Sequence, residues 1–120
     1  MSTAPAPAPA PTRYAAMFAA LGHEARVRIV RLLLAAHPDG LVAGEIQHEV
    51  GIPASTLSHH LDALETAGLI AQRREGRFLR YSAAADGLRD LLGFLYAECC
   101  TRSGLVSLSA LKRTSATIGA

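Results

Sequence analysis

The chain has 120 residues and a formal net charge of +2, and half of its residues are apolar. This length favours a single domain with one hydrophobic core. No uninterrupted apolar run approaches the ~20 residues that a membrane-spanning helix needs, so we expect no membrane segment. The two cysteines are adjacent and cannot form a useful structural disulfide with each other, which excludes an exported disulfide-stapled domain and favours the reducing cytoplasm.

The N-terminal residues 1–12 are dominated by alternating alanine and proline. This composition favours an extended, solvated polyproline II conformation and lacks the basic flank and apolar centre of a secretory signal. Residues 103–120 show no clear hydrophobic period. We therefore expect a disordered tail over residues 1–12, one folded domain over residues 13–102, and a flexible tail over residues 103–120.

Two helices are predicted early in the chain. The first carries an apolar stripe at the spacing i, i+3, i+4, i+7, made by Tyr14, Met17, Phe18 and Leu21. It is expected to end near Gly22. The second runs from Glu24 to His37, and leucines fill its later turns, so much of its circumference should be buried. The sequence HPDG at 37–40 then ends it.

A helix-turn-helix is predicted next. Leu41 and Val42 are compatible with a short strand before a helix from about Ala43, which Gly51 ends in a left-handed conformation. Pro53 lies at the start of the following helix, where its missing N–H does no harm. That helix spans residues 54–67, and the two helices are joined by the sequence GIP.

The period changes after Gly68, where LIAQRREGRFLRYSA alternates apolar and polar residues around a reversal at Glu75-Gly76. This pattern predicts a two-stranded hairpin, which must pack on the helices to be stable. A last helix begins near Asp86 and carries an apolar stripe of Leu88, Leu91, Leu92, Leu95 and Cys99. The predicted fold class is therefore mostly α with a small β-hairpin.

The helix over residues 54–67 has a surface typical of nucleic-acid contact. Its leucines cluster on one side, and short hydroxyl and imidazole side chains occupy the opposite side and its flanks. Such side chains suit close approach to phosphates and base edges. The predicted DNA contacts on this helix are Ser55, Thr56, Ser58 and His59. His60 falls nearer the leucines, so a packed, hydrogen-bonded histidine is expected there instead.

Arginines concentrate near the tip of the predicted hairpin, where Arg73, Arg74 and Arg77 can reach phosphates or a narrow minor groove. A basic hairpin by itself is also compatible with a solvated loop. The combination of a helix-turn-helix with this hairpin predicts that the chain binds double-stranded DNA.

Three segments carry a resemblance to a known family: ALGHEARVRIVRLLL, GEIQHEVGIPASTLSHHLDALETAGLI and RREGRFLRYS. Over about residues 14 to 101 the chain resembles the arsenical-resistance repressor (ArsR) family of winged helix-turn-helix regulators. The resemblance implies a homodimer through the first and last helices, a recognition helix at 54–67 and the hairpin as wing. It also implies that the protein releases its operator DNA when it binds a metal or metalloid.

The leucine content of the last helix agrees with a dimer, because one small core cannot easily cover the whole stripe. A two-fold symmetric dimer requires an inverted-repeat operator.

The two adjacent cysteines near the end of the final helix, Cys99 and Cys100, are the remaining candidates for a sensor site. The chain lacks the Cys-x-Cys of the best-known arsenite sensors of the family and the Asp-x-His and His-x-x-Glu of its zinc sensors. ECC at 98–100 is similar to the subgroup whose arsenite-binding thiols lie near the end of the final helix. The resemblance implies no permanent cofactor and an inducer, trivalent arsenic or antimony as arsenite, antimonite or methylarsenite, bound at Cys99 and Cys100.

Thiolates are soft donors that select such ions over magnesium or calcium. Arsenite favours three sulfurs, so a partner cysteine, a small thiol or a hydroxide must complete its site, whereas a methylated trivalent arsenical needs only two. Cys100 lies ~100° round the helix from Cys99, so chelation by both is expected to distort the last turn and the proposed dimer surface.

Four alternatives remain open at this stage. Cys99 can be a small core side chain with Cys100 as a chance neighbour, the thiols can form an oxidation switch, or another metal can be the signal. The winged helix can also serve protein contact without DNA. An enzyme is not expected, because no phosphate-cradling loop, paired-carboxylate pattern or oriented nucleophile is recognisable.

Overall fold

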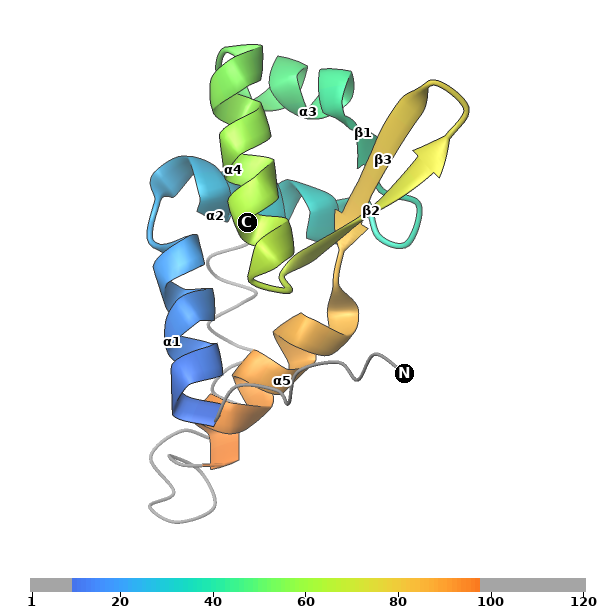
Figure 1. Cartoon of the computed structure of the whole chain (residues 1–120). Helices are drawn as coiled ribbons and strands as arrows, with labels where there is room; N and C mark the ends of the chain where they lie inside the picture. The colour runs from blue at the N-terminus through green and yellow to red at the C-terminus, as the bar shows by residue number, and fades with distance from the viewer. Residues whose placement is uncertain (1–9, 98–120) are drawn as a thin grey trace, which may run out of the picture. The chain divides into compact units, whose positions relative to one another are not determined.

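The structure, a computed structural model, describes residues 10–97. Its elements in chain order are α1 (Ala10–Leu21), α2 (Glu24–Ala35), β1 (Leu41–Val42), α3 (Ala43–Val50), α4 (Ala54–Thr66), β2 (Ile70–Glu75), β3 (Phe78–Ala83) and α5 (Ala85–Tyr96) (Figure 1). The chain divides into two units between Leu88 and Arg89, inside α5. The predicted mostly helical fold with a β-hairpin is confirmed.

Helix α1 begins earlier than the sequence prediction placed it. It starts at Ala10, so residues 10–12 belong to a helix and not to the extended tail expected over residues 1–12. Alanine is the strongest helix former, and Pro11 lies in the first turn, where no intrahelical hydrogen bond is lost. Residues 1–9 and the predicted tail at 103–120 lie outside the described residues.

The core of the first unit is built where α1 to α4 meet the start of the hairpin. Its fully buried large side chains are Met17, Ile29, Leu33, Ile46, Leu61, Leu64 and Leu69. Met17 confirms the predicted inward stripe of α1, whereas Phe18 from the same stripe remains 43% exposed. The predicted inward face of α4 is confirmed by its three buried leucines.

The hairpin is part of a three-stranded antiparallel sheet in the order β1-β3-β2. The short strand expected at Leu41–Val42 is β1, and Leu41 pairs with Tyr81 of β3. Gly40 makes this pairing possible, because it has φ 78° and a Cβ there would lie 2.2 Å from the carbonyl oxygen of Tyr81. Only glycine fits so close an approach in a left-handed conformation.

Both helices of the helix-turn-helix end as predicted. Gly51 follows α3 with φ 73°, and its N–H donates to the carbonyl of Gln47 at 2.8 Å. After α4, Gly68 adopts φ 80° and the N–H of Leu69 donates to the carbonyl of Leu64 at 3.0 Å, a Schellman-type ending. These two glycine stops fix the lengths of α3 and α4.

Helix α5 begins at Ala85, one residue before the predicted start. Of its apolar stripe, Leu91 is buried, while Leu92 is 67% and Leu95 is 43% exposed. Cys99, the predicted last member of the stripe, lies outside the described residues. No helix between residues 10 and 97 is long and apolar enough to cross a membrane.

Candidate nucleic-acid interface

The polar face of α4 is exposed as predicted. Ser55, Thr56, Ser58 and His59 are all exposed, and the buried leucines lie on the other side of the helix. Within the described chain no side chain caps the first turn of α4, since Pro53 occupies the N-cap position. The N–H groups of that turn and the positive end of the helix dipole can therefore receive a phosphate.

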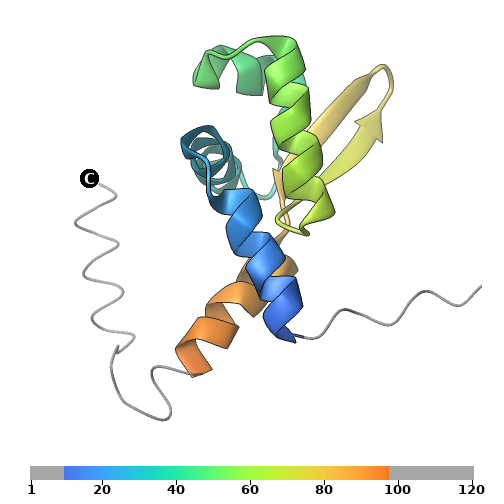
Figure 2. The same ribbon diagram turned by 60° about the vertical axis from the view of Figure 1, so that its left-hand side comes forward.

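The hairpin tip and the N-terminal end of α4 lie at the same end of the first unit, as the two views in Figures 1 and 2 both show. The tip is a tight turn in which Gly76 has φ 61°. Arg74 and Arg77 are exposed there, and neither has a hydrogen bond or ion pair to another of the residues 10–97. Both guanidinium groups are thus available to an anion approaching this end.

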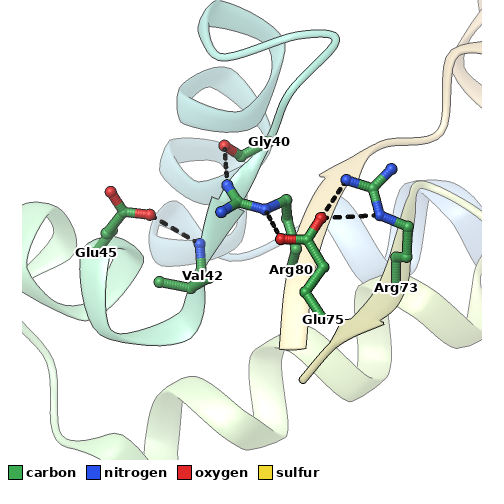
Figure 3. Close-up of polar contacts among 6 residues, drawn as sticks. All are labelled: Gly40, Val42, Glu45, Arg73, Glu75 and Arg80. Atoms are coloured by element: carbon green, nitrogen blue, oxygen red, sulfur yellow. Dashed lines mark hydrogen bonds and ion pairs between the residues drawn. The ribbon is translucent and has the colours of Figure 1, made fainter. Parts of the chain in front are cut away.

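Arg73, the third predicted hairpin contact, is engaged within the wing. Both its Nε, at 3.1 Å, and its Nη2 donate to the carboxylate of Glu75, and Arg80 Nε donates to the same carboxylate at 2.8 Å (Figure 3). These hydrogen bonds, that from Arg80 first, lower the pKa of Glu75, and Glu75 in turn raises the pKa of Arg80. One carboxylate therefore offsets one of the two positive charges, and the group of three side chains keeps a net charge of +1.

Arg80 also connects the hairpin to the chain ahead of β1, because its Nη1 donates to the carbonyl of Gly40 at 3.2 Å (Figure 3). Nearby, Glu45 of α3 accepts a hydrogen bond of 3.0 Å from the backbone N–H of Val42 and so closes the first turn of α3. The base of the wing and the start of the helix-turn-helix are thus held by adjacent polar contacts.

Behind the exposed face of α4, His60 is half-buried and accepts a hydrogen bond of 2.9 Å at Nδ1 from Nε of Arg26. The predicted hydrogen-bonded histidine is confirmed. Burial, then the charge of Arg26, then the neighbouring His23 and His59 lower the pKa of His60. A neutral imidazole is required here, because a protonated Nδ1 cannot accept a hydrogen bond.

Arg26 was not singled out by the sequence reasoning, yet only 7% of it is exposed, and its Nη1 donates to the carbonyl of Ala20 at 3.3 Å. The spacing of apolar residues in α2 does indicate that Arg26 is buried. Arg26 occupies position i of a stripe whose i+3, i+4 and i+7 members, Ile29, Val30 and Leu33, are all buried. A cation in that position must find an acceptor, which α4 and α1 supply.

The predicted thiol site at Cys99 and Cys100 lies outside the described residues. Between residues 10 and 97, no group of three or more His, Cys, Asp or Glu side chains is arranged to hold a metal ion.

An exposed polar helix face, a cationic hairpin tip at the same end and a helix-turn-helix supported by a small sheet define a winged helix-turn-helix domain. Comparison with known proteins agrees. Residues 21–73 match the family model described as "Helix-turn-helix domain". The HTH-type transcriptional regulator Rv0081 of Mycobacterium tuberculosis is 40% identical over 78 residues, which cover 65% of this chain and 67% of the relative.

A second relative is similar along most of the chain. The "Probable mercury resistance operon repressor" of Streptomyces lividans is 27% identical over 113 residues, covering 94% of this chain and 86% of the relative.

Two solved structures show the same architecture. The ArsR-like transcriptional regulator from Rhodococcus sp. RHA1 superposes with a TM-score of 0.62 at 27% identity, over 91% of this chain and 92% of that one. The homodimeric winged helix-turn-helix DNA-binding domain of a "possible ArsR-family transcriptional regulator" from Mycobacterium bovis superposes with a TM-score of 0.61 at 28% identity, over 82% and 91%. The chain belongs to the ArsR family of winged helix-turn-helix transcriptional regulators.

Proposed function

We propose that this regulator is a homodimeric repressor that binds an inverted-repeat operator and releases it when Cys99 and Cys100 bind trivalent arsenic or antimony. In this proposal Ser55, Thr56, Ser58 and His59 of α4 enter the major groove. The arginines of the wing, Arg73, Arg74 and Arg77, contact phosphates. The observation that carries DNA binding is the exposure of both surfaces at one end of the first unit.

The proposed dimer is supported by exposed apolar side chains on α1 and on α5. Leu92 and Leu95 of α5 and Phe18 of α1 are 67%, 43% and 43% exposed. Apolar side chains on a helix face are commonly covered by a partner, and the Mycobacterium bovis neighbour is a homodimer. A two-fold dimer would place two copies of α4 in successive turns of the major groove.

The ligand proposal is supported by the donor chemistry of the chain. Its only two sulfhydryls are adjacent, and thiolates prefer soft ions. Chelation by two side chains that diverge on a regular helix would deform the end of that helix. A change there that weakens operator binding by 1.4 kcal/mol lowers affinity about tenfold.

A second candidate inducer is Hg²⁺, favoured by the similarity to the Streptomyces lividans protein over 94% of this chain. Mercuric ion is also soft, and two thiolates complete its preferred linear coordination. This candidate keeps the same two cysteines and the same repressor and changes only the signal.

The experiment is a fluorescence-anisotropy titration of the promoter DNA upstream of the protein's own operon. Arsenite, methylarsenite, antimonite, Hg²⁺, Zn²⁺ and hydrogen peroxide are then added separately to the complex. We expect trivalent arsenic or antimony to release the DNA, and the double variant Cys99→Ser/Cys100→Ser to bind DNA normally but to stay bound when the inducer is added. If the same inducer also released DNA from the double variant, the proposal that Cys99 and Cys100 sense the inducer would be wrong.

The peroxide arm separates the oxidation switch from metalloid binding. A disulfide-based switch would release DNA with peroxide and recover it with dithiothreitol, without any metalloid. Native mass spectrometry of each mixture gives the number of bound ions per subunit and identifies whether a small thiol completes the site.

A further inference from the structure

The wing tip exposes an aromatic ring beside its arginines. Phe78, the first residue of β3, is 58% exposed, more than any other large apolar side chain among residues 10–88. Leu79 next to it is 38% exposed. Exposing a phenylalanine to water has an unfavourable free energy, so a side chain in this position is a strong candidate for a contact with a partner.

The strand register directs this ring away from the core. Phe78 pairs with Glu75 across the hairpin, and Arg73 pairs with Arg80 two positions further along, so these side chains share one face of the sheet. The opposite face carries Tyr81 and Ala83, which are buried. Because the faces alternate strictly, Phe78 cannot turn into the core without a slip of the whole hairpin.

The charge around the ring favours a polyanion. Glu75 offsets one of the two positive charges of Arg73 and Arg80, which share the face of Phe78, and so reduces the positive charge beside the ring. Arg77 in the turn and Arg74, which pairs with Leu79 on the opposite face, are exposed and have no carboxylate partner among residues 10–97. Arg77 directly precedes Phe78 in the turn. An apolar protein partner would have to cover these two cations, whereas a nucleic acid would neutralise them.

We propose that Phe78 enters the minor groove of duplex DNA beside each operator half-site, with Arg74 and Arg77 on the groove edges. This rests on the proposed DNA binding and assigns it a further contact. Minor-groove walls are lined by apolar sugar surface, inserted Phe side chains are a known means of contacting base steps there, and arginines are attracted to narrow A·T-rich grooves. Because TA steps are among the most easily unstacked, insertion of Phe78 would give the protein a preference for A·T-containing flanks in addition to its major-groove contacts.

The test compares Phe78→Ala with wild type on the promoter DNA and on a copy whose flanks are changed from A·T to G·C pairs. We expect Phe78→Ala to bind the native DNA about tenfold more weakly, the size of one aromatic contact with a base. Its salt dependence should equal that of wild type, because an apolar contact releases no counterions. The variant should also lose the discrimination between the two flanks.

Three further variants separate the possible explanations. Leu34→Ala removes an apolar side chain that is 48% exposed on α2, far along the chain from the wing, and should leave affinity unchanged. Leu79→Ala tests the opposite face of the hairpin and should have less effect than Phe78→Ala. Arg77→Ala should flatten the salt dependence by about one unit of slope and so distinguishes a phosphate contact from the apolar one.

Several results would overturn the proposal. One is a Phe78→Ala protein that binds both DNAs as wild type does. Another is a Phe78→Ala protein whose DNA affinity is normal but whose sedimentation coefficient in free solution changes, which would make the ring a contact between protein copies. If wild type binds no duplex DNA, the proposed function fails as well; if it binds and Phe78→Ala is neutral, only this inference fails.

Discussion

Nε of Arg26 donates a hydrogen bond of 2.9 Å to Nδ1 of His60, which joins α2 to α4, the helix proposed to read the operator. The same guanidinium reaches the last turn of α1 through the carbonyl of Ala20. A single buried cation of α2 therefore contacts two other helices, α1 and α4, and its acceptor on α4 is next to His59, a proposed base contact. This pair is thus a polar contact between α2 and α4 directly behind the exposed face of α4.

Removing the acceptor should destabilise the domain. His60→Leu leaves the buried Arg26 Nε without its partner, and we expect the free energy of unfolding to fall by about 1–3 kcal/mol, the cost of an unsatisfied buried donor. His60→Gln can accept through its side-chain oxygen and should lose less. Urea unfolding followed by circular dichroism measures both, with His59→Gln on the exposed face as the control. Equal stability of the Leu and Gln variants would show that the hydrogen bond is unimportant.

Stability should also depend on pH through His60. Its pKa lies below the ordinary 6.5, first because of burial and then because of Arg26, His23 and His59. Below pH 6.5 the unfolded chain therefore binds a proton that the folded chain resists, so the free energy of unfolding decreases as pH falls through the window below 6.5.

The measurement is a series of urea titrations between pH 7.5 and pH 5.5, compared with His60→Gln. The Gln variant should lose this part of the pH dependence. The carboxylate of Glu75 does not interfere, because its pKa is lowered from 4.5 and its contribution is lost only at more acidic pH. A wild-type curve parallel to that of His60→Gln would exclude the predicted role of His60.

The charge balance of the wing gives a prediction on DNA affinity. Glu75→Gln removes the negative charge that holds Arg73 and Arg80, so both arginines become more available to phosphates. We expect tighter binding to all DNA sequences and a steeper salt dependence by about one unit of slope. Anisotropy titrations at several salt concentrations measure this, with Glu24→Gln, an exposed acid at the start of α2, as the control for net charge. Weaker binding would mean that Glu75 acts by ordering the arginines rather than by neutralising them.

Two glycines with similar backbone angles should respond differently to alanine. Gly40 and Gly51 have φ 78° and 73°, but only at Gly40 would a new Cβ clash, with the carbonyl oxygen of Tyr81. Gly51→Ala should therefore lose about 1–2 kcal/mol from the left-handed conformation alone. Gly40→Ala should lose clearly more, because β1 must separate from β3. Thermal melting of both variants tests this, and equal losses would show that the contact at Gly40 relaxes freely.

The dimer proposal predicts the effect of a charge on α5. Leu92 is 67% exposed, so Leu92→Glu should preserve the folded domain while it disfavours a partner helix. We expect a shift from dimer to monomer in analytical ultracentrifugation and weaker operator binding. Val27→Glu, at a side chain 41% exposed on α2, is the matched control. A dimer that survives Leu92→Glu would place the interface elsewhere.

The helices and the hairpin could be predicted because their signals are local. Gly51 and Gly68 end α3 and α4, and the leucines of α4 have helical spacing, so neighbouring residues contain the information. The exposed face of α4 followed directly from the buried one. The early start of α1 is not evident from the sequence, because a proline-rich segment is typical of an extended chain, whereas in the structure helix already begins at Ala10.

The polar contacts between elements could not be predicted in the same way. Arg26 and His60 are 34 positions apart, and Arg80 and Gly40 are 40 positions apart, so no local pattern pairs them. Arg73 is predicted from the sequence to contact DNA together with Arg74 and Arg77, because the sequence shows a cluster of charge but not that Glu75 shares a face with Arg73 and Arg80. Once the register is known, the sharing of Glu75 by these two arginines follows from alternation of the faces.

The hydrogen bond from Arg80 to the carbonyl of Gly40 couples the hairpin to the helix-turn-helix. Arg80 of the hairpin is hydrogen-bonded both to Glu75 and to the peptide that leads into α3. A tilt of the wing on a flexible stretch of DNA would therefore also displace the start of the helix-turn-helix. In the proposed complex, bending of the duplex outside the half-site would then alter how α4 lies in the major groove. Operators with identical half-sites but flanking sequences of different stiffness should therefore bind this protein with different affinities.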